Sequence, residues 1–556
     1  MKRFFLFAIH ALAVTLPLTA AIDTPNETPR IVNIINFIRQ TEPRPLKISD
    51  EDLYRCTALQ VKQLKQLNLR ASFLLQYDAL INPKYAALLK DETFPGTEIG
   101  AWWEITEPHA KAAGIKWRGR FPWDWHANVG FSTGYTPQER ELLTDVYMKK
   151  FYEVFGKYPA SVGSWFIDAH TLDYMYKKYN ITASCNCKDQ IGTDGYTLWG
   201  GYWNQAYYPS KKNAYMPAQN TSAQIPVPIF RMLGSDPIYQ YDAGLGGRSQ
   251  HVISLEPVYG AGGSRVGGGS KQWVDWFFKA MFDAPALGFN YAQAGQENSF
   301  TWEKMRIGLE YQLPILANLS KQKKIRVETL AESAAWFRRK YPTTPPTAFS
   351  VLEDYRNNGK KTVWFNSRFY RVNLLWHGEK FRFRDIHLFD ENFASEYVNR
   401  AERKSTKCSF TTLPIVDGNI WSNGSVLSGL RIVSAQTGKE ILLKEPLVKQ
   451  QTPEILTVTC ETADGDSFHF TFSEDFIEVA STKQTPQWIL ELTARKNAPL
   501  PFRKISAKKI EAIHRKFSYT LSCEKGNFVP AKNEPHRIFS IQPDSGKIRL
   551  NCRNGR

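Results

Sequence analysis

Over residues 30–320, short apolar runs alternate with amphipathic segments. Apolar runs bounded by polar residues predict buried strands, and apolar residues three and four positions apart predict helices. The predicted strands cover 30–38, 70–75, 98–105, 162–167, a short run that ends at Cys187, 225–233 and 286–291. The predicted helices cover 50–67, 85–89, 136–155, 169–179, 271–282 and 300–319. This alternation predicts a parallel sheet covered by helices, and the number of repeats predicts a (β/α) barrel of about seven strands.

The pattern changes after the proline-rich segment 341–346, which we expect to be a linker. Short β-type segments follow, separated by turn pairs such as Asp464-Gly465, and they predict an antiparallel β-sandwich. The basic segment 503–516 differs, because its apolar residues stand at helical intervals and predict a solvated helix. The expected organisation is a signal peptide over 1–21, a (β/α) barrel domain that holds the chemistry over 22–341, and a β-sandwich domain over 342–556.

The N-terminus has the pattern of a secretory signal peptide. Basic Met1-Lys2-Arg3 precedes the apolar run 4–18, and small residues suited to cleavage stand near Ala20 and Ala21. We therefore expect an exported protein, periplasmic or extracellular, without stable membrane insertion. A retained anchor is the alternative.

Composition narrows the possible partners. The net charge is +17, which suits an acidic polysaccharide, an anionic membrane surface or nucleic acid, and equally a generally basic exported protein. The densest basic segment, 503–516, lacks the interleaved aromatic residues of a nucleic-acid platform, so we expect no nucleic-acid partner. The chain has only seven cysteines in 556 residues, so we expect the hydrophobic core rather than disulfide crosslinks to stabilise the fold.

Ionisable residues and aromatic rings follow the fourth and fifth predicted strands. They are Asp168, His170, Lys188, Asp189, Asp194, Trp199, Tyr202 and Trp203. Because the C-terminal ends of parallel strands meet at one rim, we expect these side chains around one opening. Carboxylates among flat aromatic rings suit a sugar-binding cleft, so the sequence predicts a carbohydrate-active hydrolase. An aromatic plug over the barrel mouth is the alternative for the rings.

A second aromatic segment follows the third predicted strand. Trp103 stands near the end of that strand, and the next loop contains Arg118, Trp123 and His126. We expect these residues to form a wall of the substrate site, and packing in the core is the alternative.

Three motifs stand in a characteristic order: Leu69–Phe73, Glu98–Gly100 and Phe155–Pro159. They resemble the LKATFF strand, the EIG strand and the FG-x-x-P motif of polysaccharide deacetylases. Over residues 30–320 the chain thus resembles the glycoside hydrolase and deacetylase superfamily, which includes α-mannosidase-type enzymes and implies a distorted (β/α)7 barrel. A closer likeness is to uncharacterised secreted proteins of polysaccharide-degrading gut bacteria, which implies an oligo- or polysaccharide substrate.

The metal ligands of that superfamily are missing. Deacetylases need Asp-Asp after the first strand and His-x-x-x-His after the third, and this chain has Phe37-Ile38-Arg39 and Ala101–Glu104 there. The His-x-Asp of the α-mannosidase type is also absent. We therefore expect no metal and no cofactor, although His126 and His170 could join Asp168 around an ion.

A metal-free glycosidase needs two carboxyl groups that face each other across the scissile bond. The resemblance implies that they stand at the ends of the fourth and seventh strands, where this chain has Asp168 and Glu297, with Glu256 behind the latter. We expect Asp168 to act as nucleophile or base and Glu297 as the acid. Glu104, which follows two tryptophans, is the next catalytic candidate.

Each acid also has a structural alternative. Asp168 and Glu297 could each cap the helix that follows it. Glu104 could form a salt bridge with Arg118 or Arg120.

The sequence thus predicts an exported glycosidase that needs no metal. A polysaccharide-deacetylase-like esterase with rearranged ligands is the alternative enzyme. A barrel that binds glycan without cleaving it is the alternative from another class, because both known metal sites of the superfamily are missing.

Overall fold

The computed structural model describes residues 28–44, 48–91, 96–258, 266–483, 487–531 and 534–554. The predicted signal peptide over 1–21 lies outside these residues. Among the helices in the described ranges, none combines the length and the hydropathy needed to span a bilayer.

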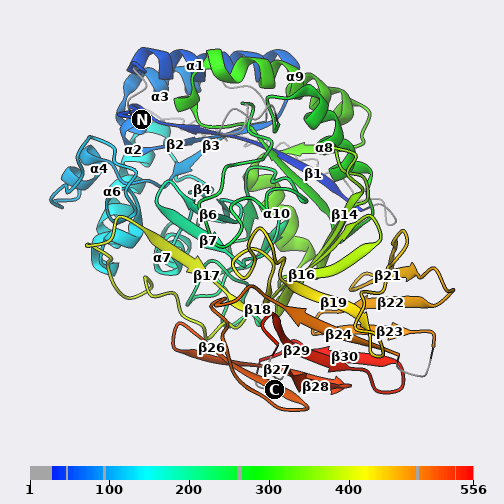
Figure 1. The fold of residues 1–556 in the computed structure, drawn as a ribbon. Coiled ribbons are helices and arrows are strands. Elements are labelled where there is room, and N and C mark those ends of the chain that lie inside the picture. The colour runs from blue at the N-terminus through cyan, green and yellow to red at the C-terminus, as the bar shows by residue number, and fades with distance from the viewer. Residues whose placement is uncertain are drawn as a thin grey trace, which may run out of the picture.

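Seven parallel strands form a curled sheet in the first part of the chain (Figure 1). Their order is β11 (Asn290–Ala294), β1 (Arg30–Ile38), β2 (Ala71–Leu75), β3 (Thr97–Trp102), β4 (Ser161–Gly163), β5 (Ala183–Asn186) and β9 (Ile229–Arg231). At one edge β8 (Ala206–Tyr207) runs antiparallel to β9, and β12 (Arg326–Glu328) pairs in parallel with the first half of β1. The sheet agrees with the mixed α/β class predicted from the alternating pattern.

The sheet stays open between β9 and β11, since these two strands do not pair in the described part of the chain. Side chains bridge the opening instead. Asn204 Nδ2 donates to the Tyr291 carbonyl at 3.0 Å, and the Leu233 N–H donates to Gln293 Oε1 at 2.7 Å. A closed (β/α)7 barrel is therefore not confirmed, whereas a curled half-barrel is present.

Helices cover the outside of this sheet, where α1 and α9 run side by side (Figure 1). The α-helices are α1 (Asp50–Leu67), α2 (Tyr77–Ile81), α3 (Pro83–Asp91), α4 (Glu107–Ala112), α5 (Ala127–Gly130), α6 (Pro137–Phe155), α7 (Ala169–Tyr179), α8 (Lys271–Asp283), α9 (Trp302–Lys321) and α10 (Leu330–Lys340). Two short 3-10 helices are η1 (Ser132–Gly134) and η2 (Asn298–Phe300). Ser49 and Thr136 form capping boxes at α1 and α6, and Gly156 ends α6 in the left-handed conformation, so these predicted boundaries are confirmed.

From Thr347 onward, every described element is a strand. A ten-stranded sheet contains β10 (Ala286–Leu287), β13 (Thr347–Val351), β14 (Lys360–Asn366), β15 (Tyr370–His377), β16 (Lys380–Leu388), β18 (Leu413–Asp417), β19 (Gly429–Ser434), β24 (Trp488–Thr493), β28 (Asn527–Pro530) and β29 (Arg537–Gln542). An eight-stranded sheet contains β20 (Leu447–Thr452), β21 (Ile455–Glu461), β22 (Ser467–Phe472), β23 (Phe476–Ser481), β25 (Phe502–Ile505), β26 (Lys509–His514), β27 (Phe517–Lys525) and β30 (Lys547–Asn551). Rings from the two sheets meet, with the centroids of Phe381 and Phe470 5.0 Å apart. The C-terminal region is thus all-β, as predicted.

The two parts of the chain interlock. Strand β10, from before residue 341, pairs with β13, and a three-stranded sheet joins β6 (Gln190–Thr193) and β7 (Tyr196–Trp199) to β17 (Cys408–Thr411). The domain boundary at 341/342 therefore stays a prediction. All seven cysteines lie in the described residues as buried free thiols, so the core carries the fold without crosslinks.

The helix predicted over 503–516 is wrong, because this segment is the hairpin of β25 and β26. Lys509 and Glu511 are exposed in β26, whereas Ile510 and Ala512 are buried. This two-residue alternation is the period of a half-buried strand, and it overrides the helical spacing of the isoleucines.

A buried ion network joins the end of β5 to the ten-stranded sheet. Arg371 of β15 binds both oxygens of Asp385 at 2.8 Å, and its Nη1 lies 2.6 Å from Asp189 Oδ2. Arg231 of β9 also binds Asp189, at 2.9 Å. Since these four charges are buried, each needs its partners to be stable away from water.

We expect Arg371→Ala to lower the free energy of unfolding by about 3–5 kcal/mol, because it leaves Asp189 and Asp385 buried without this cation. Urea unfolding at neutral pH measures the change. The control, Arg368→Ala, removes a partly exposed pair with Glu474 in the same region and should cost less than about 1 kcal/mol. Equal losses in the two variants would contradict the role of the network.

Candidate active site

A cleft lies at the C-terminal ends of β1, β3 and β11. Its lining residues are Arg39, Arg44, Glu104, Trp123, Trp125, Phe131, Trp165, Asp194 and Glu297. Arg39 directly follows β1, Glu104 stands shortly after β3, and Glu297 stands shortly after β11. The parallel topology therefore brings together side chains that are far apart in the sequence, at the edge where such sheets place their chemistry.

Local geometry fixes Glu297 beside Arg39. Gly295, with φ 84°, ends β11 so close to β1 that a Cβ there would lie 2.4 Å from the Ile35 carbonyl oxygen. The side chain of Asn298 then accepts a hydrogen bond from the Arg39 N–H at 2.9 Å and donates to the Arg39 carbonyl at 2.8 Å. Glycine permits the close approach, and the asparagine holds the two chain segments in register.

The buried guanidinium of Arg39 joins two carboxylates. Its Nη2 and Nε lie 2.7 and 3.0 Å from the oxygens of Glu104, and its Nη1 lies 2.6 Å from Glu297 Oε2. Its central carbon stands 4.1 Å from the centroid of the Trp123 ring. Burial disfavours the charge, but the two glutamates outweigh it and raise the pKa of Arg39 above its ordinary value. Arg39 is thus a permanent cation at the base of the cleft.

Glu104 is fully occupied by its partners. Besides Arg39, Gln76 donates to its Oε2 at 2.7 Å, and the side chain is buried. The salt bridge predicted with Arg118 or Arg120 is wrong, because Arg120 binds Asp124 and Arg118 donates to a backbone carbonyl. The sequence did not identify Arg39 as the partner of Glu104, because Arg39 follows β1 and the predicted partners were taken from the loop after Glu104.

Asp194 is the most exposed carboxyl group of the cleft. It forms the β6–β7 turn with Gly195, and both residues have the positive φ that an Asp-Gly hairpin turn requires. Of its side chain, 51% is exposed, compared with 6% for Glu297. Desolvation by the crowded recess nevertheless raises the pKa of Asp194, an effect that Arg44 opposes and Glu297 reinforces.

Arg44 lies between the two acids. Its Nη1 is 3.8 Å from Asp194 Oδ1, and its Nη2 is 3.6 Å from Glu297 Oε1. The free volume of the cleft is about 20 Å³, which is roughly the space of one water molecule. A sugar can therefore enter only if the exposed Asp194 and the partly exposed Arg44 move, although Arg44 also donates to Glu42 at 2.6 and 2.7 Å.

Asp168 caps α7, as its structural alternative predicted. Its oxygens accept from Arg140 at 2.9 Å, from the Ser132 hydroxyl at 2.6 Å, and from the Thr171 N–H and hydroxyl at 3.0 and 2.6 Å. Burial alone would raise the pKa of Asp168, but Arg140 and these donors outweigh it and lower the pKa. Asp168 is not among the described residues that line the cleft. Its catalytic role stays a prediction that these contacts do not favour.

A second recess contains Lys188, Asp189, Trp203, Asn204, Arg231, Met232 and Ser235. Burial lowers the pKa of Lys188. Burial also raises the pKa of the nearby Glu256 to about 7, and Glu256 accepts a hydrogen bond from Gln296, the neighbour of Glu297. Gln296 in turn accepts from the Glu297 N–H at 2.7 Å, so Glu256 is connected through Gln296 to the backbone of a cleft residue.

The remaining predicted rings belong to the core. Trp103 packs against His109 and Tyr147, and Trp203 stacks on Trp364 with centroids 3.8 Å apart. Trp199 donates to Asp417 at 2.8 Å, and the Tyr202 hydroxyl bonds to Thr347 at 2.6 Å. The contacts of Trp103 agree with the predicted alternative of packing in the core, and none of these four rings is among the described residues that line the cleft.

The two predicted histidines lie apart from the cleft lining. His170 bonds to Glu141 at 2.9 Å, and His126 Nδ1 lies 3.8 Å from Asp124. Within the described ranges, no group of three His, Cys, Asp or Glu side chains could hold a metal ion. The guanidinium of Arg39 also stands where the superfamily places an aspartate ligand, so these residues do not fit that metal centre.

The sequence analysis did not name Arg39, Arg44, Trp125, Phe131 and Trp165 as members of the cleft, although Trp125 stands in the loop expected to form a wall of the substrate site. One signal was available for Arg39, since a charged residue directly follows a fully apolar strand and strand ends carry the chemistry of this fold. No local signal identified Arg44 or Phe131, because they reach the cleft through loops.

Asp168→Asn should keep the cap but leave Arg140 buried without its counterion, and lower the free energy of unfolding by about 3–5 kcal/mol at neutral pH. Because the folded-state pKa of Asp168 is lowered, this contribution is complete above its unfolded pKa and is lost as the pH falls through the folded value. Asp145→Asn weakens a partly exposed pair with Lys178 between the same two helices but keeps the oxygen that accepts from the Tyr174 and Tyr179 hydroxyls, so it should cost about 1 kcal/mol or less. An Asp168→Asn protein of wild-type stability that lacks turnover would instead support the catalytic role.

No protein-family model matches the chain, and no curated protein sequence matches it with significance. Among solved structures, a protein of Parabacteroides distasonis that is provisionally described as a glycoside hydrolase/deacetylase has a TM-score of 0.50 and 16% identity, covering 70% of this chain and 91% of that one. A provisionally described polysaccharide deacetylase of Mycobacterium smegmatis has a TM-score of 0.35 and 12% identity, covering 59% and 98%. A GH57 branching enzyme of Thermococcus kodakaraensis has a TM-score of 0.30 and 9% identity, covering 56% and 71%. The likeness to the Parabacteroides structure is one of fold, and the description of that structure names the superfamily that the sequence motifs resemble.

Proposed function

We propose that this protein is a carbohydrate-active hydrolase, and more closely a glycosidase that works without a metal and uses Glu297 and Asp194 as its carboxyl pair. The main observation that supports this proposal is that both acids lie in one cleft, on either side of Arg44. The N-terminal sequence further supports action outside the cytoplasm on an oligo- or polysaccharide. Glu297 was expected to be the acid, and its surroundings favour the opposite role.

The two acids have different surroundings. Glu297 lies 2.6 Å from Arg39 and 3.6 Å from Arg44, so two cations adjoin the carboxyl group that we assign as nucleophile or base. Asp194 is exposed, and its raised pKa favours the protonated form that a general acid needs. Pairs of acids separated in this way divide the two roles of glycoside hydrolysis.

The aromatic wall supports a sugar as the ligand. Trp123, Trp125 and Trp165 line the cleft, and the ring of Trp125 is partly exposed beside Asp194 and Glu297. Flat rings next to hydrogen-bonding acids can stack on the face of a sugar while its hydroxyls bond to the carboxylates. Because the cleft is narrow, the incoming sugar must displace the side chain of Arg44.

Asp194→Asn and Glu297→Gln should each lower kcat by about 10²–10⁴-fold on a glycan that the wild type cleaves, because each removes one half of the acid–base pair. Asparagine tolerates the positive φ at position 194, so the turn should survive. Asp283→Asn, an exposed acid at the end of α8, is the matched control and should leave kcat unchanged. Product release is measured by reducing-end analysis on a panel of plant, host and microbial glycans, and wild-type rates in both cleft variants would refute the pair.

The pH profile gives an independent test. Activity should fall as the pH rises through the pKa of Asp194, because the general acid must be protonated. Arg44 lowers this pKa, so Arg44→Gln should move the alkaline limb of kcat/KM to higher pH. Arg55→Gln, which affects only an exposed pair with Glu303, should leave the limb in place. A limb that does not move in Arg44→Gln would exclude Asp194 as the acid.

A second candidate is a barrel that binds glycan without cleaving it. It is favoured by the small free volume of the cleft and by the complete pairing of Glu104 and Arg39. A binder should retain its affinity for glycan in Asp194→Asn and release no product in the wild type. Binding by isothermal titration calorimetry and product analysis on the same glycan separate the two functions.

A further inference from the structure

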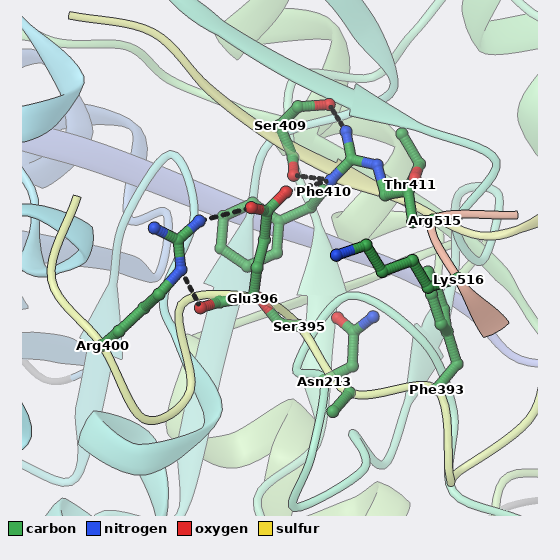
Figure 2. Close-up of a pocket in the computed structure, with 11 residues that line it drawn as sticks. Asn213, Phe393, Ser395, Glu396, Arg400, Ser409, Phe410, Thr411, Arg515 and Lys516 are labelled. Atoms are coloured by element: carbon green, nitrogen blue, oxygen red, sulfur yellow. Dashed lines mark hydrogen bonds and ion pairs between the residues drawn. The ribbon is translucent and has the colours of Figure 1, made fainter. Parts of the chain in front are cut away.

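A larger pocket lies outside the cleft, at the seam between the two parts of the chain (Figure 2). Its volume is about 310 Å³, which is within the range of roughly 300–1,000 Å³ typical of small-molecule sites. It is lined by Asn213, Phe393, Ala394, Ser395, Glu396, Arg400, Ser409, Phe410, Thr411, Arg515 and Lys516. We call this the seam pocket. None of these residues lines the cleft.

Cations outnumber acids in the seam pocket. Arg400, Arg515 and Lys516 face a single carboxylate, Glu396. Glu396 binds Arg400 at 2.5 Å and Arg515 at 2.8 Å, whereas Lys516 makes no hydrogen bond or ion pair within the described part of the chain. The pocket therefore carries an uncompensated positive charge, which favours an anionic ligand.

A buried amide points to the same ligand. Asn213 is only 2% exposed, and its Oδ1 accepts from the Tyr215 N–H at 3.1 Å. Among the described residues, its Nδ2 has no acceptor. Figure 2 shows this amide and the Lys516 amine turned toward the same space. Although Asn213 is buried, its Nδ2 atom keeps contact with the open space of the pocket, where a ligand oxygen could accept its hydrogen bond.

The turn that presents these cations is strained. Arg515 and Lys516 form the two-residue loop between β26 and β27, with φ values of 44° and 67°. Such turns favour asparagine and glycine, since other residues adopt positive φ at a cost in free energy. Arg515 also donates to the carbonyl and hydroxyl of Ser409, so its guanidinium is fixed across the pocket mouth. Two long cationic side chains thus occupy positions that local stability alone would not select.

We propose that the seam pocket binds a small hydroxylated carboxylate of the uronic acid class. Lys516, Arg515 and the Asn213 amide would hold the carboxylate, because all three are donors. Glu396 would bind ring hydroxyls, since a carboxylate has more acceptor positions than its two arginines occupy, and the Thr411 hydroxyl, which bonds to His514 at 2.8 Å, has capacity for a further hydrogen bond. The rings of Phe393 and Phe410 supply the apolar walls.

Binding of sodium glucuronate to the full protein by isothermal titration calorimetry tests this site, with glucose and inorganic sulfate as the neutral and anion-only probes. Glucuronate should bind, glucose and sulfate should bind at least about tenfold more weakly, and Lys516→Gly should weaken glucuronate binding about tenfold. Glycine suits the positive φ at position 516, so this variant should fold. Asn213→Asp keeps the acceptor for Tyr215 and should also weaken binding, because it replaces the donor with a negative charge.

Lys380→Ala, which removes an exposed charge from the β15–β16 hairpin, is the matched control and should bind like the wild type. Asp194→Asn should also bind normally, so the seam pocket is tested separately from the proposed catalytic pair. No glucuronate binding up to about 10 mM, or unchanged binding in Lys516→Gly and Asn213→Asp, would overturn the proposal. Sulfate binding as tight as glucuronate binding would overturn the assignment to a hydroxylated carboxylate.

Discussion

Buried arginines determine how the acids of this protein are used. Arg39, Arg140, Arg231 and Arg371 are all removed from water, and a buried cation is stable only beside carboxylates. Their partners are Asp168, Asp189, Asp385, Glu104 and Glu297, four of which follow strands of the parallel sheet. Most acids at the C-terminal edge of the sheet thus neutralise buried arginines. Some of these ion pairs also join the half-barrel to the β region.

Because of this constraint, the acids differ in how many hydrogen bonds they can still accept from a substrate. Asp168, Asp189 and Glu104 accept hydrogen bonds on both oxygens from buried donors, which leaves them little capacity for a substrate. Glu297 contacts Arg39 through one oxygen and accepts from the Ser299 hydroxyl at 2.7 Å through the other, which also faces the partly exposed Arg44, and Asp194 is half exposed. The acids suited to react are therefore those at the outer end of the network.

Local features of the fold could be predicted from the sequence, and the pairing of charges could not. The helix caps at Ser49 and Thr136 and the apolar strand over 30–38 depend on neighbours in the chain. Arg39 and Glu104 are 65 positions apart, and Arg371 and Asp189 are 182 apart, so no local pattern indicates which cation meets which acid. The prediction of a helix over 503–516 was wrong for another reason. The isoleucines there satisfy the helical period, and only the alternation of buried and exposed residues distinguishes the strand from a helix.

The central claim is that a sugar binds between Asp194 and Glu297. A crystal structure of Asp194→Asn with an oligosaccharide that the protein binds tests it most directly, because this variant keeps the shape of the acid without its proton. We expect a sugar ring on the face of Trp125, with Arg44 displaced and a glycosidic oxygen within hydrogen-bond distance of residue 194. An oligosaccharide bound elsewhere, with the Arg44 contacts to Glu297 and residue 194 intact, would contradict the account.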